Sequence, residues 1–322
     1  MRNLTNQIST TLKKKSAWQD FLIEVRKNWV LMLMVLPMML YIFIFSYIPM
    51  GGIIIAFKKY TYAGVFASEW IGFENFELFV ESGKMWSLTR NTLMYNIVFI
   101  ALGVVTKIGF AIMITEMWTK YYKRTLQSIM MLPHFLSWVV IGGLAYNMLN
   151  YEYGTINNIL DTMFNMERIN VYTNTSIWPG IFAFLSVWHG TGYGMVFYLS
   201  AIIGINPELY EAAYLDGAGL MQRIFKITIP LIMPTTIIML LLSLGGILKG
   251  NMDMFYQVIR DNSFLYDATD VIDTYVFRSL TTAGSDLGVT AATGLYQQVI
   301  GCVLVLTVNG IVRHVDEESA LF

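Results

Sequence analysis

The stretch Glu211–Pro234 reads EAAYLDGAGLMQRIFKITIPLIMP and lies between two long apolar runs of the chain. Just before it, Asn206 is a favoured residue type for a helix N-cap, and Pro207 suits the first helical position. Glu208 places a carboxylate in the first turn, where the helix dipole stabilises negative charge. Gly217 accepts the left-handed backbone that often ends a helix. We therefore expect a short helix that begins at Pro207 and ends before Gly217.

Small side chains occupy the middle of this expected helix. Ala212 and Ala213 remove side-chain bulk, so the backbone can come close to another protein. Glu211 offers a carboxylate to a cationic partner, and Tyr210, Tyr214 and Leu215 offer apolar anchors. The pattern favours a helix that docks in a groove of a partner protein. The alternative is an amphipathic connector that rests on the bilayer.

The composition of the 322-residue chain indicates a membrane protein. Hydrophobic residues make up 56% of it and charged residues only 13%, which leaves too little polar surface for a soluble globule of this size. The net charge of −1 and the lack of a basic tail give no indication of a nucleic-acid partner. Cys302 is the only cysteine, so the chain has no pair for a disulfide. The histidines His134, His189 and His314 lack the spacing of a metal site, and we expect none.

Six runs are long and apolar enough to cross a hydrocarbon core of roughly 30 Å, which needs about 20 residues per helix. They are Trp29–Phe57, Thr92–Thr115, Leu126–Leu149, Ile177–Gly204, Ile229–Leu248 and Val289–Val312. The first and fourth are long enough to tilt or to contain a break. A second short helix, Leu220–Ile227, is expected to lead into the fifth run. The longest polar stretches, residues 58–91 and 249–288, are expected to hold a short helix each and little more.

Lysine and arginine residues in short loops set the orientation of these runs. Such residues crowd the segment before the first run and the link between the second and third: Arg2, Lys13, Lys14, Lys15, Arg26, Lys27, Lys120, Lys123 and Arg124. Both termini, and the loop at residues 206–230, are therefore expected to face the cytoplasm. We expect residues 1–28 to form a cytoplasmic segment, in which Leu12–Asn28 lies along the inner membrane surface as an interfacial helix. Residues 29–322 are expected to form an all-α transmembrane domain of six helices.

Polar residues inside the runs mark a candidate path through the membrane, because they normally face a cavity or another helix. Four recur at helical spacing on the fourth run: Ser186, His189, Tyr193 and Ser200. A matching patch on the sixth run consists of Thr293, Tyr296 and Gln297. The sequence HGTGYG at residues 189–194 has three glycines, which predicts a break in the fourth helix near the midplane. The alternative is that these residues only bond neighbouring helices.

Two further features limit the possible functions. Lys107 lies inside the second run near its cytoplasmic end, and we expect its ammonium group to reach the membrane surface rather than to serve transport. No G-x-x-x-x-G-K-[ST] sequence occurs, so energy for transport has to come from a partner or an ion gradient. Asp270 and Asp273 share a spacing typical of one helical face, but no nucleophile or metal motif accompanies them. We expect a transport subunit and not an enzyme.

Seven residues of the loop carry a family resemblance: Glu211, Ala212, Ala213, Gly217, Ile227, Ile229 and Pro230. Their identities and spacing resemble the EAA loop of ABC-importer permeases, with Ile227 or Ile229 at a position before the proline that is usually leucine. The resemblance implies that residues 206–230 form a coupling loop whose helix docks in a cleft of the ATPase subunit. Glu211, Ala212, Ala213 and Gly217 would then be the ATPase-coupling residues.

The resemblance extends over nearly the whole chain. Five stretches are similar to the polysaccharide-type branch of the maltose-type sugar permeases: residues 47–58, 90–96, 132–144, 204–218 and 270–278. It implies the type I ABC importer permease fold, a multi-pass location in the bacterial plasma membrane, and a role as one half of a permease heterodimer. It also implies two copies of a cytoplasmic ATPase, which bind ATP and magnesium, and an extracellular sugar-binding lipoprotein. No cofactor is expected in this chain.

The substrate implied by the resemblance is an oligosaccharide or a polysaccharide fragment. Aromatic faces stack on sugar rings, and polar side chains bond their hydroxyl groups. The residues expected along the substrate path are Trp188, His189, Tyr193, Asn251, Asp253, Tyr256, Tyr296 and Gln297. The rival hypothesis is a gradient-driven secondary transporter that acts without an ATPase. Such a transporter would need titratable groups within the membrane-spanning helices, and the apolar runs contain few besides His189 and Lys107.

Overall fold

The computed structural model describes residues 25–61, 63–282 and 286–315. The chain divides into two units, residues 1–54 and residues 55–322, and each is described by itself. Most of the expected interfacial segment Leu12–Asn28, and residues 316–322 at the C-terminal end, lie outside the described residues.

The first unit is helical and apolar. It contains α3 (Trp29–Ile42), a π-helical turn (Phe43–Tyr47) and α4 (Ile48–Met50), and a 3-10 segment (Gly51–Phe57) continues into the second unit. Together, Trp29–Phe57 is long and apolar enough to cross a membrane, with a mean hydropathy of 2.3. The π-turn ends two residues before Pro49, whose ring lacks an N–H and clashes with the carbonyl of the preceding turn. The local change of helix type therefore accommodates the proline.

Two further helices in the second unit meet the length and composition of a membrane span. These are α6 (Lys84–Glu116) and α18 (Leu287–Val315). Two further pairs of helical segments, each bent at a short break, are long and apolar enough to cross a membrane if each pair is counted as one span. In the first, α7 (Lys120–Met131) and a 3-10 turn (Leu132–Phe135) meet α8 (Trp138–Leu149) at 93°.

The second bent pair follows the loop at residues 206–230. It contains α12 (Leu220–Arg223), a π-turn (Ile224–Thr228) and α13 (Ile229–Leu231), which meet α14 (Met233–Leu244) at 58°. This π-turn also ends two residues before a proline, Pro230. The expected short helix at Leu220–Ile227 is thus a stretch of mixed helix type that continues to Leu231.

The expected fourth span is α10 (Trp178–Ile203), a continuous helix of 26 residues. This helix is long enough to cross a membrane, but it is not among the described helices that are also apolar enough to do so. The polar and glycine residues at positions 189–194 lower its hydropathy. The structure therefore has three helices, or up to five with the bent pairs, that pass on length and composition within the described residues.

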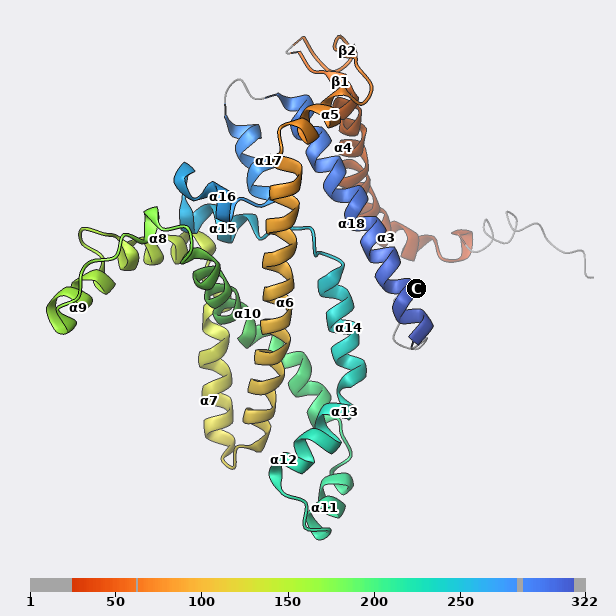
Figure 1. Ribbon diagram of the computed structural model, residues 1–322. Coiled ribbons are helices and arrows are strands. Elements are labelled where there is room, and N and C mark those ends of the chain that lie inside the picture. The colour runs from red at the N-terminus through yellow and green to blue at the C-terminus, as the bar shows by residue number, and fades with distance from the viewer. Residues whose placement is uncertain (1–24, 62, 283–285, 316–322) are drawn as a thin grey trace, which may run out of the picture. The chain divides into compact units, whose positions relative to one another are not determined.

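Shorter elements lie around the first halves of α6 and α18, where β1, β2 and α5 are at the end and α9 projects to the side (Figure 1). The strands β1 (Lys58–Lys59) and β2 (Glu69–Trp70) pair antiparallel, with Lys58 opposite Trp70, and α5 (Glu74–Glu81) follows. α9 (Thr155–Phe164) and a 3-10 turn (Val171–Thr173) precede α10. α15 (Met252–Ile259), a 3-10 turn (Ser263–Leu265), α16 (Tyr266–Thr269) and α17 (Ile272–Thr281) precede α18.

The expectation of one short helix in residues 249–288 is wrong. This stretch holds three α-helices and a 3-10 turn, and it buries Met254, Phe255, Val258 and Ile272 almost completely. The apolar residues of α15 recur at helical spacing, so the helix covers apolar surface rather than extending into water.

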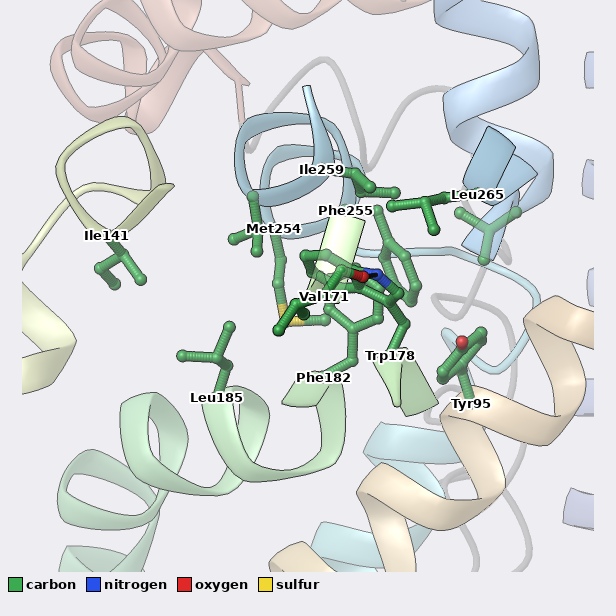
Figure 2. Packing of buried hydrophobic residues seen from close by; sticks show 12 residues of the cluster. Tyr95, Ile141, Val171, Trp178, Phe182, Leu185, Met254, Phe255, Ile259 and Leu265 are labelled. Carbon is green, nitrogen blue, oxygen red and sulfur yellow. Dashed lines mark hydrogen bonds between the residues drawn. The ribbon is translucent and has the colours of Figure 1, made fainter. Parts of the chain in front are cut away.

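An aromatic cluster holds these helices on the ends of α6 and α10 (Figure 2). The ring of Phe182 lies 4.2 Å from that of Phe255, and Tyr95 on α6 lies 4.9 Å from Phe255, measured between centroids. Trp178 is fully buried and donates its Nε1 hydrogen bond to the Val171 carbonyl at 3.0 Å. Buried aromatic side chains contribute strongly to stability, so this cluster stabilises the end of the unit.

A second cluster joins α6 and α10 at the opposite end. It contains Ala111, Ile112 and Ile114 of α6 with Met195, Tyr198, Leu199 and Ile202 of α10, and Ile232 at the start of α14 completes it. Between the two clusters, the hydroxyls of Thr106 and Thr191 lie 3.1 Å apart. The α6–α10 pair is the frame on which the candidate functional regions are built.

Candidate functional site

The loop at residues 206–230 contains the helix that the sequence predicts. α11 (Pro207–Leu215) begins where Asn206 accepts a hydrogen bond on its side-chain oxygen from the Glu208 N–H at 3.1 Å. The Asn206 amide also donates to the Glu208 carboxylate at 3.1 Å. Each contact satisfies a polar group at the helix start, where backbone N–H groups have no partner within the helix. The predicted start at Pro207 is confirmed.

The end of α11 depends on Gly217, whose φ is +77°. The Ala218 N–H donates to the Ala213 carbonyl at 2.9 Å, and the Gly217 N–H donates to the Tyr214 carbonyl at 3.1 Å. This pattern closes a helix only through a left-handed residue. A Cβ at Gly217 would meet no atom within 4 Å, so backbone conformation, and not space, requires glycine there.

Apolar side chains on α11 are exposed although the rest of the unit has a buried core. Tyr214 is 73% exposed and Leu215 is 86% exposed, and Glu211 and Ala212 are exposed beside them. Ala213 is half-buried. Neighbouring apolar side chains of this size, exposed together on a short helix, are typical of a surface that another protein covers.

One contact from α11 and one from α12 connect the loop at residues 206–230 to α14 and α6. The hydroxyl oxygens of Tyr210 and Thr228 lie 2.9 Å apart, which joins α11 to the π-turn that leads into α14. Arg223 lies 3.9 Å from the Glu116 carboxylate at the end of α6. The loop at residues 206–230 therefore contacts both the π-turn that leads into α14 and the end of α6.

A second candidate region is an open cavity of about 500 Å³ lined by α6, α10, α14 and the segment after α14, here called the transmembrane cavity. Three of the residues expected on the substrate path line it: His189, Tyr193 and Asn251. Lys107, His134 and Lys249 line it as well, and sequence reasoning had not assigned them to the path. The expectation that Lys107 reaches the membrane surface is wrong, since its side chain faces the cavity.

The Tyr193 ring and the imidazoles of His134 and His189 form one wall of the transmembrane cavity, and Trp138 packs on His189 outside the lining. The Tyr193 and His134 rings stack with centroids 4.4 Å apart and an angle of 9°. The Trp138 and His189 rings lie 4.4 Å apart, and His189 Nε2 lies 3.3 Å from the Leu136 carbonyl. His134 and Trp138 come from the 3-10 turn after α7 and from the start of α8, far from α10 in the sequence, so no local pattern in the sequence marked them.

The predicted break at residues 189–194 is wrong, because α10 runs through it without interruption. Two of the three glycines there allow close packing instead. A Cβ at Gly192 would collide with the Met130 carbonyl group, and one at Gly194 would lie 2.6 Å from Lys107 Cδ. The glycines bring α7 and the Lys107 side chain against α10.

The other residues expected on the path lie outside the lining of the transmembrane cavity. Trp188 is 37% exposed, Asp253 is exposed, and the Tyr256 ring packs 4.9 Å from Phe277. The Tyr296 hydroxyl lies 3.0 Å from that of Thr89. Gln297 donates to the Leu248 carbonyl at 2.7 Å and to the Asp273 carboxylate at 2.8 Å.

Gln297 belongs to a cluster around a buried carboxylate on α17. Asp273 also accepts a hydrogen bond from the Gly250 N–H at 2.5 Å. Burial raises the pKa of Asp273 above its ordinary value of 3.8, and the Gly250 and Gln297 donors only partly offset this. The cluster ties α17 and α18 to the segment after α14. In the described part of the chain, no group of three His, Cys, Asp or Glu residues is arranged to hold a metal ion.

Comparison with known proteins identifies the family. The model of the binding-protein-dependent transport system inner membrane component matches residues 21–314. Protein LplB of Bacillus subtilis is 33% identical over 295 residues, which cover 91% of each chain. The polygalacturonan/rhamnogalacturonan transport system permease protein YteP of the same organism is 30% identical over 97% of this chain and 96% of its own.

Solved structures agree with the sequence relatives. A chain in the crystal structure of a bacterial ABC transporter involved in the import of the acidic polysaccharide alginate superposes with a TM-score of 0.83. It is 32% identical and is matched over 92% of this chain and 99% of its own. A chain of the alginate transporter in complex with an alginate pentasaccharide-bound periplasmic protein gives a TM-score of 0.82 at 32% identity, over 93% of this chain and 98% of its own. The chain is a membrane protein that belongs to the family of binding-protein-dependent transport system inner membrane components, the permease subunits of ABC importers.

Proposed function

We propose that the chain is one of two permease subunits of an ATP-driven importer that takes up oligosaccharides or polysaccharide fragments. An extracellular binding protein delivers the saccharide, and two cytoplasmic ATPase subunits, which bind ATP and magnesium, supply the energy. The chain crosses the bacterial plasma membrane six times, and both termini face the cytoplasm. The names of two relatives support this substrate class, since one transports polygalacturonan or rhamnogalacturonan and another imports alginate.

The observation that carries the proposal is the exposed apolar end of α11 beside the left-handed Gly217. In this proposal Glu211, Ala212, Ala213 and Gly217 contact the ATPase. Closure of the ATPase dimer on ATP moves α11, and the Tyr210–Thr228 contact passes the movement to the π-turn before α14. Arg223 of α12, which follows α11 in the same loop, passes it to Glu116 at the end of α6.

The transmembrane cavity supplies the path. Its wall offers the Tyr193 ring, which is 47% exposed, and the polar groups of His189 and Asn251 for contact with a saccharide. Trp188, Asp253, Tyr256, Tyr296 and Gln297, which do not line this cavity, would act at other positions along the path.

A substitution at Gly217 tests coupling in the complete complex reconstituted in liposomes. Gly217→Val forces a β-branched residue into a left-handed backbone, at a cost of about 1–3 kcal/mol. We expect saccharide uptake and binding-protein-stimulated ATP hydrolysis to fall together by about tenfold or more, while the complex stays assembled.

Gly83→Val is the control for backbone strain. Gly83 has a φ of +69° with no atom within 4 Å of a built Cβ, and it lies at the start of α6, away from the coupling loop. This variant should retain uptake. Full uptake and stimulated hydrolysis in an assembled Gly217→Val complex would refute coupling through α11. Uptake without ATP by the chain alone would instead support the gradient-driven transporter.

A further inference from the structure

We propose that the transmembrane cavity selects saccharides that carry carboxylate groups, and that the Lys107 ammonium group is the residue of this chain that binds them. The inference rests on the proposed function, because it assigns a substrate class to the same path. Three observations support it. Lys107 lines the cavity, no carboxylate pairs with it among the described residues, and no acidic residue lines the cavity there.

The side chain of Lys107 is held along the wall of the cavity. Its stem lies over Gly194 of α10, where a built Cβ would be 2.5 Å from Cε and 2.6 Å from Cδ. Its Nζ lies 3.4 Å from a Cβ built at Gly103, one turn earlier on α6. A Cβ at Gly194 would collide with the lysine stem, whereas one at Gly103 would only contact it, so Gly194 makes room for this side chain.

No carboxylate neutralises Lys107 in the part of the chain that the structure describes. The ion pairs there are Arg168–Asp161, Arg223–Glu116 and Arg278–Asp270. An ammonium group inside a membrane span is costly and normally faces a partner or a polar cavity. Since Lys107 lines the transmembrane cavity, an anion in that cavity is the available partner.

The rest of the lining favours an anion over a cation. None of the described residues that line the cavity is an aspartate or a glutamate. Lys249 lines the cavity near Asn251, but the neighbouring Asp273 carboxylate partly balances its charge. His134 Nδ1 is buried and has no hydrogen-bond partner among the described residues.

The shape of the site favours a sugar acid over a small anion. The half-exposed Tyr193 ring lies in the same wall and offers an aromatic edge to a sugar ring. A cavity of about 500 Å³ is large enough for sugar rings. A uronic-acid unit combines a ring for Tyr193 with a carboxylate for Lys107. Charge-assisted hydrogen bonds of this kind are stronger than neutral ones, and more so where water is scarce.

The test compares a galacturonic-acid trisaccharide with the galactose trisaccharide obtained by reducing its carboxyl groups, and an alginate trisaccharide with its own reduced form. Uptake is measured with the complete complex and its binding protein in ATP-loaded liposomes. Lys107→Met removes the charge at nearly constant length, and Lys107→Arg keeps it. Because one binding protein serves every variant, the ratio of variant to wild type cancels its selectivity.

We expect Lys107→Met to lower kcat/KM for the uronate form by about tenfold or more and to change uptake of the reduced form by less than about twofold. Lys107→Arg should retain most of the uronate uptake. Lys120→Met, at an exposed lysine outside the cavity, should change neither. If the binding protein carries only the uronate form, the binding of both forms to the detergent-purified complex is measured by calorimetry instead. The affinity ratio of variant to wild type for each form then replaces the uptake ratio.

Three results would overturn the inference: equal losses for both forms in an assembled Lys107→Met complex, no loss for the uronate form, or wild-type import of the reduced form alone. These leave ATP-driven saccharide import intact. If an assembled wild-type complex imports none of the saccharides, the proposed function fails as well.

Discussion

The hydroxyl groups of Tyr210 and Thr228 lie 2.9 Å apart and join α11 to the π-turn before α14. Thr228 is only 3% exposed, so this contact is shielded from water. Pro230 follows two residues later, and the bend at Ile232 lies beyond it. α11 is therefore attached to α14 through a segment that already departs from regular α-helix.

Removing the Tyr210 hydroxyl should loosen this attachment. Tyr210→Phe keeps the ring and loses one hydrogen bond, worth about 1 kcal/mol. We expect faster hydrogen exchange in α11 and fewer saccharides imported per ATP hydrolysed, with assembly unchanged. Tyr151→Phe, at an exposed tyrosine near α9, is the control. Unchanged exchange in α11 would show that the contact does not restrain the helix.

The exposed end of α11 should be needed for association with the ATPase but not for folding. Leu215 is 86% exposed, so Leu215→Ser removes little buried surface from this chain. We expect the thermal midpoint of the isolated permease to change by no more than about 1 °C. Copurification of the ATPase should fall several-fold. Phe66→Ser, at a side chain 99% exposed between β1 and β2, should leave copurification unchanged, and equal losses in both variants would contradict the assignment.

Gly192 should be essential for packing α10 against α7. A Cβ at this position collides with the backbone of Met130, which cannot move as a flexible side chain does. We expect Gly192→Ala to destabilise the protein by about 1–3 kcal/mol, measured by thermal unfolding in detergent. Gly190→Ala is the matched control on the same helix, because its Cβ would meet no atom within 4 Å. A Gly192→Ala variant as stable as Gly190→Ala would contradict this packing.

Asp273 should make stability depend on pH in a defined direction. Burial raises its pKa above 3.8 in the folded protein, so folding favours the protonated carboxyl. The resulting stabilisation is complete below that ordinary value and is lost as the pH rises through the raised pKa. Asp273→Asn stays neutral and keeps an oxygen that can accept from Gly250 and Gln297.

The relevant quantity is the difference in thermal midpoint between Asp273→Asn and wild type across that range of pH. We expect the difference to shift in favour of the variant as the pH rises above about 4 and then to become constant. A shift in favour of wild type would mean that the Gly250 and Gln297 donors outweigh burial.

Local signals in the sequence predicted α11 well. Its start depends on Asn206 and Pro207 and its end on Gly217, and each acts within a few residues of its own position. The apolar runs likewise predicted the first, second and sixth spans, because a hydrocarbon core demands continuous apolar length.

Features that depend on distant neighbours could not be predicted in this way. Glycines at residues 189–194 are compatible with either a helix break or close packing. The outcome is close packing, because Met130 lies against Gly192 and Lys107 lies against Gly194. His134 stacks on Tyr193 from the 3-10 turn after α7, and α7 packs on α10 where Gly192 meets Met130. Gln297 shares a helical face with Tyr296, yet Asp273 and the Leu248 carbonyl occupy its amide group. The buried face of α15, in contrast, could have been predicted. Its apolar residues recur at helical spacing in the sequence, which indicates a packed helix where we expected little structure.

The central claim is that α11 faces the cytoplasm and docks on an ATPase. The most direct measurement places a single cysteine at Leu215 in a Cys302→Ser background, since Cys302 is exposed in the structure. Whole cells and inside-out vesicles are treated with a membrane-impermeant maleimide, and a thiol–amine cross-linker is applied to a separate sample of the assembled complex whose thiol is unlabelled. We predict labelling only in inside-out vesicles and a cross-link to the ATPase subunit. Labelling from outside intact cells, or a cross-link to the extracellular binding protein, would contradict the account.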